Sequence, residues 1–328
     1  MINFGIIGTN WITHSYIAGA QATGKWNLAA VYSRKEDTAK EFASKYEGQK
    51  ISIHTTLESL ASDSNISAVY IASPNSLHYE HAKLILETGK HVVLEKPATC
   101  TSAQLSTLFE IAHSKKVVLI EAFRHLHEKN MITLKKSLGK LGPIFGASLN
   151  YAQYSSRYDA VLAGERPNIF TLDFGGGSLV DLGVYCVAAS IFLFGAPKSS
   201  KYYPVILEQT GADGGGTLTL EYEGFAVTII ASKIFASAAP SEVFGRNGTL
   251  VVPTITDIES VTYLDPKKKG EKELNLKEEA EEYARIIGEG DWEAVGRWEE
   301  LSKAVIAVTE GCRRENGLLF PVEREGKD

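Results

Sequence analysis

A lysine, an aspartate and a tyrosine in this chain have the types and spacing that acid–base chemistry needs. Lys96 follows an apolar run and precedes Pro97, which places an ammonium group at the carboxyl edge of a predicted sheet, where ligands bind. Asp181 and Tyr185 are four residues apart, so on a helix they share one face. A nearby ammonium would lower the tyrosine pKa from its usual value of about 10. The same residues also allow a structural arrangement, in which Lys96 pairs with Glu95 and Tyr185 packs in a helix core.

A run of three glycines, Gly175-Gly176-Gly177, precedes the segment that carries Asp181 and Tyr185. Glycines let a chain enter a helix close to a ligand, because they have no side chain to keep the two apart. The polar residues upstream of the run either line the mouth of a substrate site or belong to a solvated loop. They are Arg157, Tyr158, Arg166 and Asn168.

The first predicted strand–helix turn reads Gly8-Thr9-Asn10-Trp11-Ile12-Thr13 and has the position of a phosphate-binding turn. Free backbone N–H groups and the helix dipole favour an anion there. Of the dinucleotide fingerprint G-x-G-x-x-G/A, only the first glycine, Gly8, is present. Asn10 replaces the second and tolerates a left-handed backbone, so we expect the turn to survive with an amide near the phosphate. Thr13 replaces the third as a small residue, and an ordinary strand–helix turn remains the alternative.

The end of the second predicted strand indicates which nicotinamide cofactor would fit. Val31-Tyr32-Ser33-Arg34-Lys35 has no acid at the tip, where an acid would hold the ribose hydroxyls of NAD. Ser33 lies 25 residues after Gly8, close to the usual spacing of about 20. A hydroxyl followed by two cations suits a 2′-phosphate, with Arg34 as its clamp. The pattern favours NADP over NAD, the alternative being that Arg34 and Lys35 merely begin a solvated helix.

Short apolar runs alternate with helical patterns through the first third of the chain. The predicted strands are Asn3 to Ile7, Asn27 to Tyr32, Ala68 to Ala72, His91 to Leu94 and Val117 to Ile120. The predicted helices are Ile12 to Ala22, Lys35 to Tyr46, Leu77 to Thr88 and Ser102 to His113. This alternation predicts right-handed βαβ units and a parallel, doubly wound α/β sheet.

The pattern changes after Glu121 to strands that follow one another with few helices. They are Ile144 to Tyr154, Tyr202 to Leu207, Gly215 to Tyr222, Phe225 to Phe235, Leu250 to Val252 and Ile258 to Leu264. Two charged helices follow, Leu276 to Ile287 and Trp292 to Arg314. We expect a mainly antiparallel sheet here, with a cleft between the two halves.

Composition disfavours several classes of partner. The net charge of −6 disfavours nucleic acid and anionic membranes, which need clustered positive charge. Lys267-Lys268-Lys269 follows Pro266 and is typical of a solvated turn. Three separated cysteines (Cys100, Cys186 and Cys312) favour a reducing compartment. The longest apolar stretch, Val184 to Ala196, is shorter than the roughly 20 residues that span a bilayer, and we see no signal peptide, so we expect a cytoplasmic protein.

Four motifs in this order resemble the Gfo/Idh/MocA oxidoreductase family over almost the whole chain. They are the turn at Gly8, Ser73-Pro74-Asn75-Ser76-Leu77-His78, Glu95-Lys96-Pro97, and Gly175 through Tyr185. The resemblance implies a Rossmann domain over residues 1–121 and an α/β domain with a large open sheet over residues 122–328. It also implies a homodimer or larger homo-oligomer formed through that sheet, and Ser33-Arg34 looks like the NADP-using members.

The resemblance also implies which residues lie along the cofactor. They are Gly8, Thr9, Asn10, Trp11 and Ile12 at the turn, Ser33 and Arg34, then Ser73, Pro74, Asn75 and His78, with Glu95, Lys96 and Pro97 on the nicotinamide side and Arg124 after the sixth strand. A cis bond before Pro97 is common in the family. His127-Glu128 departs from the family's usual His-Pro. His78 and His81 share a helical face but have no third ligand, so we predict no metal.

The activity that follows is an NADP-dependent dehydrogenase or reductase for a sugar, polyol or vicinal diol. Tyr185 would be the general acid/base, Lys96 its electrostatic partner, and Asp181 would orient the substrate hydroxyl or Lys96. Two alternatives stay open. One is a regulator or sensor that binds NADP without turnover, and the other is a glycosidase that works through transient oxidation.

Overall fold

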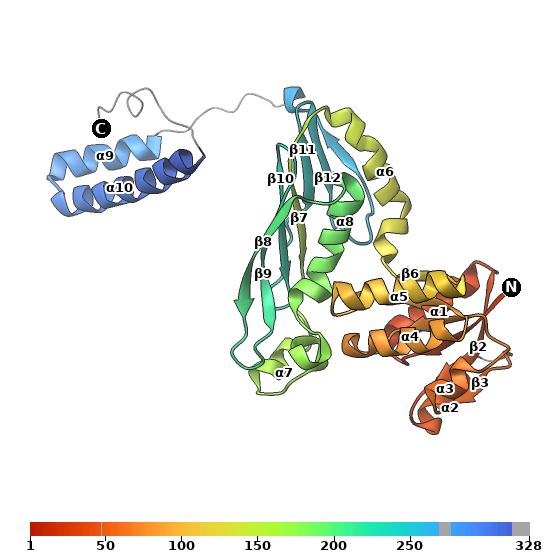
Figure 1. The fold of residues 1–328 in the computed structure, drawn as a ribbon. Coiled ribbons are helices and arrows are strands. Elements are labelled where there is room, and N and C mark those ends of the chain that lie inside the picture. The colour runs from red at the N-terminus through yellow and green to blue at the C-terminus, as the bar shows by residue number, and fades with distance from the viewer. Residues whose placement is uncertain (47, 269–276, 317–328) are drawn as a thin grey trace. The chain divides into compact units, whose positions relative to one another are not determined.

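In the computed structural model, residues 1–46, 48–268 and 277–316 are described. The chain divides into two units, residues 1–268 and 269–328, and each is treated by itself (Figure 1). Everything that the sequence predicts to carry chemistry lies in the first unit. That unit holds two sheets, which are connected by the segment after β6 (Leu119–Glu121).

The first sheet has six parallel strands in the order β3-β2-β1-β4-β5-β6. They are β1 (Ile2–Ile7), β2 (Trp26–Tyr32), β3 (Ser52–His54), β4 (Ala68–Ile71), β5 (His91–Leu94) and β6. The strands at its centre are apolar along their length because helices cover both faces: all four residues of β4 are buried. The order reverses between β1 and β4, which is the switch point where ligands bind in doubly wound sheets.

Helices on each face of this sheet bury separate apolar clusters. α1 (Trp11–Ala22) and α2 (Glu36–Ser44) pack Ile17 and Phe42 on one side. On the other side, α3 (Leu57–Ala61), α4 (His78–Glu87) and α5 (Ser102–Lys115) pack Leu60, Ile85 and Leu108. α5 begins where the side chain of Thr101 accepts a hydrogen bond from the Gln104 N–H, as an N-cap does.

The second sheet has seven strands in the order β13-β12-β11-β7-β10-β9-β8. They are β7 (Ile144–Ala152), β8 (Ser199–Ile206), β9 (Asp213–Glu221), β10 (Ala226–Ser232), β11 (Ser241–Gly245), β12 (Gly248–Val252) and β13 (Thr262–Leu264). Every pair is antiparallel except β7 with β10, which is parallel. A mainly antiparallel sheet is therefore confirmed, with one parallel pair at its centre.

Helices α6 (Lys129–Ser137) and α8 (Val184–Phe194) cover one face of this sheet (Figure 1). Cys186 and Ala189 of α8 are fully buried in the same apolar cluster as Leu149 and Ile229 of the sheet. A short helix, α7 (Tyr158–Leu162), follows β7, and a single π-helical turn (Leu179–Gly183) leads into α8. This packing fixes the helix that carries Tyr185 against β7 and β10.

The predicted fold class is confirmed, and the elements that the sequence reading missed include β3, α3, α6, α7 and β11. β3 has three residues, and α3 and β11 have five, so each repeats its pattern only once or twice, whereas α6 has nine residues. The predicted strand Ile258 to Leu264 is shorter, because only Thr262–Leu264 pairs with β12. The predicted domain boundary between residues 121 and 122 stays a prediction.

The second unit contains α9 (Lys277–Glu289) and α10 (Trp292–Glu315). The Asp291 side chain caps α10 by accepting a hydrogen bond from the Ala294 N–H at 3.0 Å. Both predicted helices are found, although Leu276, the first residue of one prediction, lies outside the described residues, as does Lys269 of the predicted turn.

One segment of the described chain, Leu172–Phe194, has the length and apolar composition to cross a membrane. The apolar stretch identified from the sequence, Val184 to Ala196, is shorter than this segment. The segment is made of several short helical pieces, and its Asp181 is ion-paired with two lysines. One face of α8 packs on the sheet, and 39% of the apolar window is buried inside the protein.

Candidate active site

The carboxyl ends of β1, β4 and β5 open into a cleft of about 730 Å³ in the first unit. From the first half of that unit the lining includes Asn10, Trp11, Ile12, Ala72, Ser73, Pro74, Asn75, His78, Glu95, Lys96 and Arg124. From the second half it includes Tyr151, Gln153, Tyr154, Ser155, Ser156, Asn168, Ile169, Phe174, Asp181, Leu182, Tyr185 and Lys233. The cleft therefore joins the predicted phosphate turn to the predicted catalytic residues.

The turn after β1 requires glycine at position 8. Gly8 has a φ of +106°, and a Cβ placed on it would lie 2.4 Å from the Ala72 carbonyl oxygen. An L-residue is strained at such a φ, and the contact is with backbone that a rotamer change cannot move. Gly8 thus lets the turn run directly beside the end of β4.

Asn10 has a different role from the one that the sequence suggested. Its backbone is extended, with φ −91° and ψ −178°, so Asn10 does not adopt the left-handed backbone that asparagine tolerates. Its side chain caps α1 by accepting from the Ile12 N–H at 3.2 Å and donates to the Ala72 carbonyl at 3.2 Å. Thr13 is fully buried, as a replacement for a small residue must be, and Trp11 is 76% exposed.

Ser33 and Arg34 follow β2, the strand beside β1, but neither belongs to the cleft lining in the part of the chain that is described. The Ser33 Oγ accepts from the Lys35 N–H at 3.3 Å, and the Arg34 side chain is exposed. α2 begins at Glu36, directly after these residues. The exposed guanidinium of Arg34 therefore lies at the same edge of the sheet as the cleft.

The two histidines after β4 are occupied by local hydrogen bonds. His78 is fully buried, with Nδ1 2.9 Å from the Pro97 carbonyl and Nε2 2.8 Å from the Ser73 carbonyl, so it ties two turns of the cleft wall together. His81 Nδ1 lies 3.0 Å from the Ser73 Oγ, and burial lowers the pKa of His81 to about 4. Across residues 1–46, 48–268 and 277–316 no cluster of three or more potential metal ligands occurs.

Asn75 and the glycine run hold the two halves of the cleft wall together. The Asn75 amide donates to the Gly175 carbonyl at 2.8 Å. A Cβ on Gly176 would lie 2.5 Å from the Asn168 carbonyl oxygen. The run thus approaches the chain itself closely at Gly176, and its approach to a ligand stays a prediction.

The residues beside Lys96 fix the loop after β5. Glu95 accepts a hydrogen bond from the Tyr70 hydroxyl at 2.7 Å and from the Lys96 N–H at 3.2 Å, and burial raises its pKa. The Lys96–Pro97 bond is cis, as the family resemblance implies. Glu121 accepts from the Ala98 N–H at 2.8 Å, which holds the other side of the loop. Glu95 therefore does not pair with the Lys96 side chain.

The ammonium of Lys96 contacts Asp181 instead and lies close to Tyr185. Lys96 Nζ donates to Asp181 Oδ1 and to the Asp181 carbonyl, each at 2.9 Å, and it is 4.8 Å from the centre of the Tyr185 ring. Burial opposes the charge on Lys96, but Asp181, Tyr185 and Glu95 together outweigh it and raise the pKa of the ammonium. The structure thus brings the three predicted residues together, with Asp181 in the π-helical turn and Tyr185 at the start of α8.

Burial governs the ionisation of Tyr185. Removal from water raises the Tyr185 pKa, although Lys96 and Arg124 act to lower it. The net lowering that the sequence suggested was therefore wrong. The ring meets His125 edge to face at 5.0 Å and Tyr151 at 5.4 Å, so its orientation is fixed from two sides.

Lys233 is a cleft residue that the sequence reading missed. It follows β10, is 1% exposed, and places Nζ 2.8 Å from Asp181 Oδ2 and 2.5 Å from the Ile169 carbonyl. The sequence does contain a signal for Lys233, because this lysine comes shortly after the apolar run Ile229-Ile230-Ala231. Lys96 likewise comes shortly after an apolar run. The predicted strand, Phe225 to Phe235, included Lys233 as an ordinary strand residue, whereas β10 ends at Ser232.

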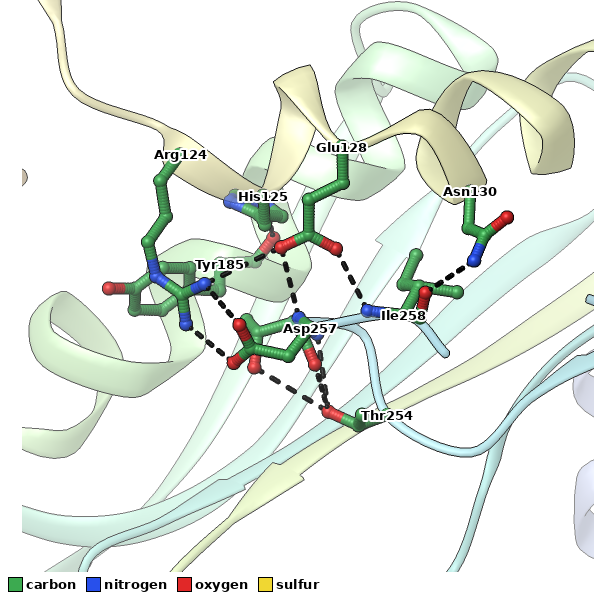
Figure 2. A network of polar contacts seen from close by, with 9 residues as sticks. Arg124, His125, Glu128, Asn130, Tyr185, Thr254, Asp257 and Ile258 are labelled. Carbon is green, nitrogen blue, oxygen red and sulfur yellow. Dashed lines mark hydrogen bonds and ion pairs between the residues drawn. The ribbon is translucent and has the colours of Figure 1, made fainter. Parts of the chain in front are cut away.

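Arg124 is held at the rim of the cleft by an acidic pair (Figure 2). Its guanidinium donates to both oxygens of Asp257, at 2.7 and 2.8 Å, and to Glu128 at 3.4 Å. Glu128 in turn accepts from the backbone N–H groups of Asp257 and Ile258. Glu128, which stands where the family usually has proline, therefore holds the loop around Asp257 against the segment after β6.

The residues upstream of the glycine run divide between cleft and scaffold. Asn168 lines the cleft. Tyr158 packs on the buried Val161 and Phe170, and Arg166 donates to the Gln209 carbonyl at 3.4 Å. Arg157 is exposed. The polar residues that line this side come instead from the loop after β7 and include Gln153, Ser155 and Ser156.

Comparison with known proteins identifies the family. Residues 2–123 match a family described as an oxidoreductase family with an NAD-binding Rossmann fold, and residues 136–251 match the GFO/IDH/MocA C-terminal domain. The chain is 37% identical over 336 residues to the scyllo-inositol 2-dehydrogenase (NADP(+)) IolU of Bacillus subtilis, covering 99% of this chain and 100% of that one. It is 36% identical over 330 residues to the uncharacterised oxidoreductase YgjR of Escherichia coli, covering 98% and 99%.

Solved structures agree on the fold. An NAD-binding protein from Listeria innocua has a TM-score of 0.70 at 22% identity, covering 83% of this chain and 78% of that one. A variant of the 3-ketoreductase KijD10 from Actinomadura kijaniata, solved with TDP-benzene and NADP, has a TM-score of 0.68 at 23% identity, covering 80% and 84%. With both halves matched in order, the chain belongs to the Gfo/Idh/MocA family of oxidoreductases.

Proposed function

We propose that this protein is an NADP-dependent dehydrogenase or reductase that interconverts a carbinol and a carbonyl on a sugar, polyol or vicinal diol. The observation that carries the proposal is the single cleft that joins the glycine turn at Gly8 to Lys96, Asp181 and Tyr185. One end of the cleft suits a pyrophosphate, and the other end has a lysine, a carboxylate and a tyrosine in contact.

The residues along the cleft fit a dinucleotide. The turn residues Gly8 and Thr9, with Asn10, Trp11 and Ile12 at the start of α1, would receive the pyrophosphate. Ser33 and Arg34, which follow β2 outside the cleft lining, would receive the 2′-phosphate. Ser73, Pro74, Asn75 and His78 would form the cleft wall, with Arg124 at its rim. Glu95, Lys96 and Pro97 would lie on the nicotinamide side. A bound nicotinamide supplies the hydride acceptor or donor. The name of the relative IolU, an NADP(+) enzyme, supports NADP over NAD.

Tyr185 would carry the proton. In the reducing direction its hydroxyl donates a proton to the carbonyl oxygen as the hydride reaches the carbon. In the oxidising direction the ionised tyrosine takes the hydroxyl proton. Because burial raises the Tyr185 pKa, the group is ready as an acid near neutral pH, and Lys96 stabilises the ionised form when it forms.

The substrate side of the cleft is rich in groups that recognise hydroxyls. Gln153, Ser155, Ser156 and Asn168 offer both donors and acceptors beside Tyr185. Relatives are named for scyllo-inositol, D-xylose and trans-1,2-dihydrobenzene-1,2-diol, which are all polyhydroxy rings or vicinal diols. These compounds and their ketones are therefore the first substrates to test.

Turnover in the variant Tyr185→Phe tests the assignment. The purified protein is assayed with NADP and each of these substrates, and NADPH binding is measured in parallel by quenching of tryptophan fluorescence. We expect Tyr185→Phe to lose most turnover and keep NADPH affinity, whereas the control Tyr203→Phe, on β8 and 53% exposed, keeps both. Wild-type turnover in Tyr185→Phe would refute the role.

A non-catalytic sensor gains no support from the site. The reason to consider it was Asn10 in place of the second fingerprint glycine, and Asn10 caps α1 and bonds to the end of β4, which keeps the turn intact. Nor does any contact in the cleft favour the glycosidase alternative.

We also propose that two copies associate through the open face of the second sheet. Helices α6 and α8 cover only the other face, and Tyr203 and Val205 of β8 are about half exposed. Light scattering of the full chain tests this, and a monomer at micromolar concentration would refute it. The domain boundary after residue 121 belongs to the same proposal.

A further inference from the structure

Lys233 is a buried charge that the proposed proton transfer does not use. It is the first residue after β10, which ends at Ser232, and its side chain is 2% exposed. A lysine head is rarely buried this deeply, because losing its hydration costs several kcal/mol unless partners replace the water. An apolar side chain would fill this space at lower cost. The partners of Lys233 should therefore show why a lysine is present here.

Those partners come from two other parts of the cleft. Lys233 Nζ pairs with Asp181 Oδ2 at 2.8 Å and donates to the Ile169 carbonyl at 2.5 Å, while it lies 4.3 Å from the centre of the Phe170 ring. Asp181 is in the π-helical turn, and Ile169 is in the segment before the glycine run. One ammonium therefore fastens two walls of the cleft to the end of β10.

The consequence for Asp181 is that each of its oxygens is held by a different lysine. Oδ1 accepts from Lys96 at 2.9 Å, and Oδ2 accepts from Lys233. A carboxylate with one partner can rotate about its χ2 bond, whereas a carboxylate held at both oxygens cannot rotate without breaking a charge-assisted bond. Since Lys96 also donates to the Asp181 carbonyl, its ammonium is fixed beneath the Tyr185 ring.

The consequence for charge is that two cations share one anion. Burial disfavours the carboxylate, but Lys96 and Lys233 outweigh it and lower the Asp181 pKa, so Asp181 stays ionised and is a weak base. Lys233 thus adds a second positive charge beside Asp181, while the Glu95 carboxyl in the same cleft acts in the opposite direction on Tyr185. The other charged or titratable groups around Tyr185 and Lys233 include Tyr70, Arg124, His125, Tyr151 and Asp213.

We propose that Lys233 is a positioning residue of this active site, which holds Asp181 and through it fixes the ammonium of Lys96 against Tyr185. The positive charge of Lys233 favours the ionised tyrosine and disfavours the cationic, oxidised nicotinamide relative to the reduced one. This inference rests on the proposed function, because that function puts the nicotinamide beside Lys96.

The test compares Lys233→Met with Lys90→Met in the full-length protein. Lys90 is the matched control, since it is 8% exposed and donates to the Asp63 and Ile66 carbonyls outside the cleft. We expect both variants to melt at lower temperature. Only Lys233→Met should lose kcat, by about tenfold or more, with a smaller change in KM, and only it should need higher pH for half-maximal oxidation.

A binding readout separates this inference from the proposed function. In Lys233→Met the ratio of the NADP to the NADPH dissociation constants should fall by about threefold or more, because one positive charge has left the floor of the cleft. Lys90→Met should keep the wild-type ratio. If the wild type binds both cofactors but turns over no polyol, the proposed function fails, and the ratio still tests Lys233. An unchanged ratio, kcat and pH midpoint in a folded Lys233→Met would overturn the inference.

The variant Lys233→Arg keeps the positive charge, and it provides a second test of the inference if Lys233→Met does not fold. A guanidinium cannot keep both contacts in this space, so we expect a several-fold loss of kcat with the wild-type pH midpoint and the wild-type cofactor ratio. An unchanged kcat would show that the orientation of Asp181 does not depend on this ammonium. Asp181→Asn gives a second check, because replacing Lys233 in that background should have a much smaller effect on kcat.

Discussion

Replacing Gly8 by alanine is the sharpest test of the phosphate turn. The new Cβ would lie 2.4 Å from the Ala72 carbonyl oxygen and 2.8 Å from the carbonyl carbon, where ordinary contacts are longer by about 1 Å. The φ of +106° adds strain for any L-residue. Ala72 cannot retreat easily, since its N–H donates to the Ile7 carbonyl at 2.8 Å and its own carbonyl accepts from Asn10. The turn must therefore move away from β4.

The size of the effect follows from these two terms. Backbone strain of about 1–3 kcal/mol and the clash together should lower the free energy of unfolding by about 2–4 kcal/mol. A turn displaced by several tenths of an ångström also misplaces its N–H groups, so we expect NADPH to bind about tenfold more weakly or worse. Urea unfolding measures the first quantity, and quenching of tryptophan fluorescence measures the second.

Gly19→Ala is the control for this experiment. Gly19 lies within α1, and a Cβ on it would have nothing within 4 Å. Alanine in a helix should add about 0.5–1 kcal/mol to the free energy of unfolding and leave NADPH affinity unchanged. The same substitution in the same helix–turn unit should thus have opposite signs at the two positions. Wild-type stability and wild-type NADPH affinity in Gly8→Ala would refute the account of the turn.

Three further predictions concern the cofactor and the proton. Lys96→Ala should abolish most turnover while NADPH stays bound, measured by steady-state rates and fluorescence titration; wild-type rates would remove Lys96 from the mechanism. Arg34→Ala should weaken NADPH much more than NADH, and equal losses would mean that Arg34 does not touch the 2′-phosphate. Because burial raises the Tyr185 pKa, reduction should persist through neutral pH and oxidation should speed up as pH rises; an oxidation rate that falls between pH 7 and 9 would contradict this assignment.

Local sequence patterns were enough to predict five of the six strands of the first sheet, whereas the grouping of Lys96 with Asp181 and Tyr185 depended also on the family resemblance. A parallel sheet aligns its carboxyl ends at one edge, so an apolar run that ends in a lysine fixes the position of that lysine without any knowledge of the rest. Asp181 and Tyr185 are close in sequence, and their spacing keeps them on one side even though Asp181 lies in a π-helical turn.

The parts that sequence reasoning missed depend on contacts between distant segments or on environment. The partner of Lys233 lies on another element, and no periodicity links β10 to the π-helical turn. The bond from Asn10 to Ala72 was not predicted, because it depends on how β1 and β4 pair. The direction of the Tyr185 pKa was misjudged because burial, which a sequence does not display, outweighs the nearby ammonium.

The charges around Tyr185 also explain why the proton is expected at this residue and not at Asp181. The Asp181 carboxylate is an obvious candidate for a general base. However, Lys96 and Lys233 each lower its affinity for a proton. Tyr185 has the opposite balance, since burial keeps it protonated and Lys96, near its ring, favours its ionised form. In the proposed mechanism, such a group would give up and regain a proton as charge develops on the substrate oxygen. Asp181 would act there by remaining charged, because a lysine holds each of its two oxygens.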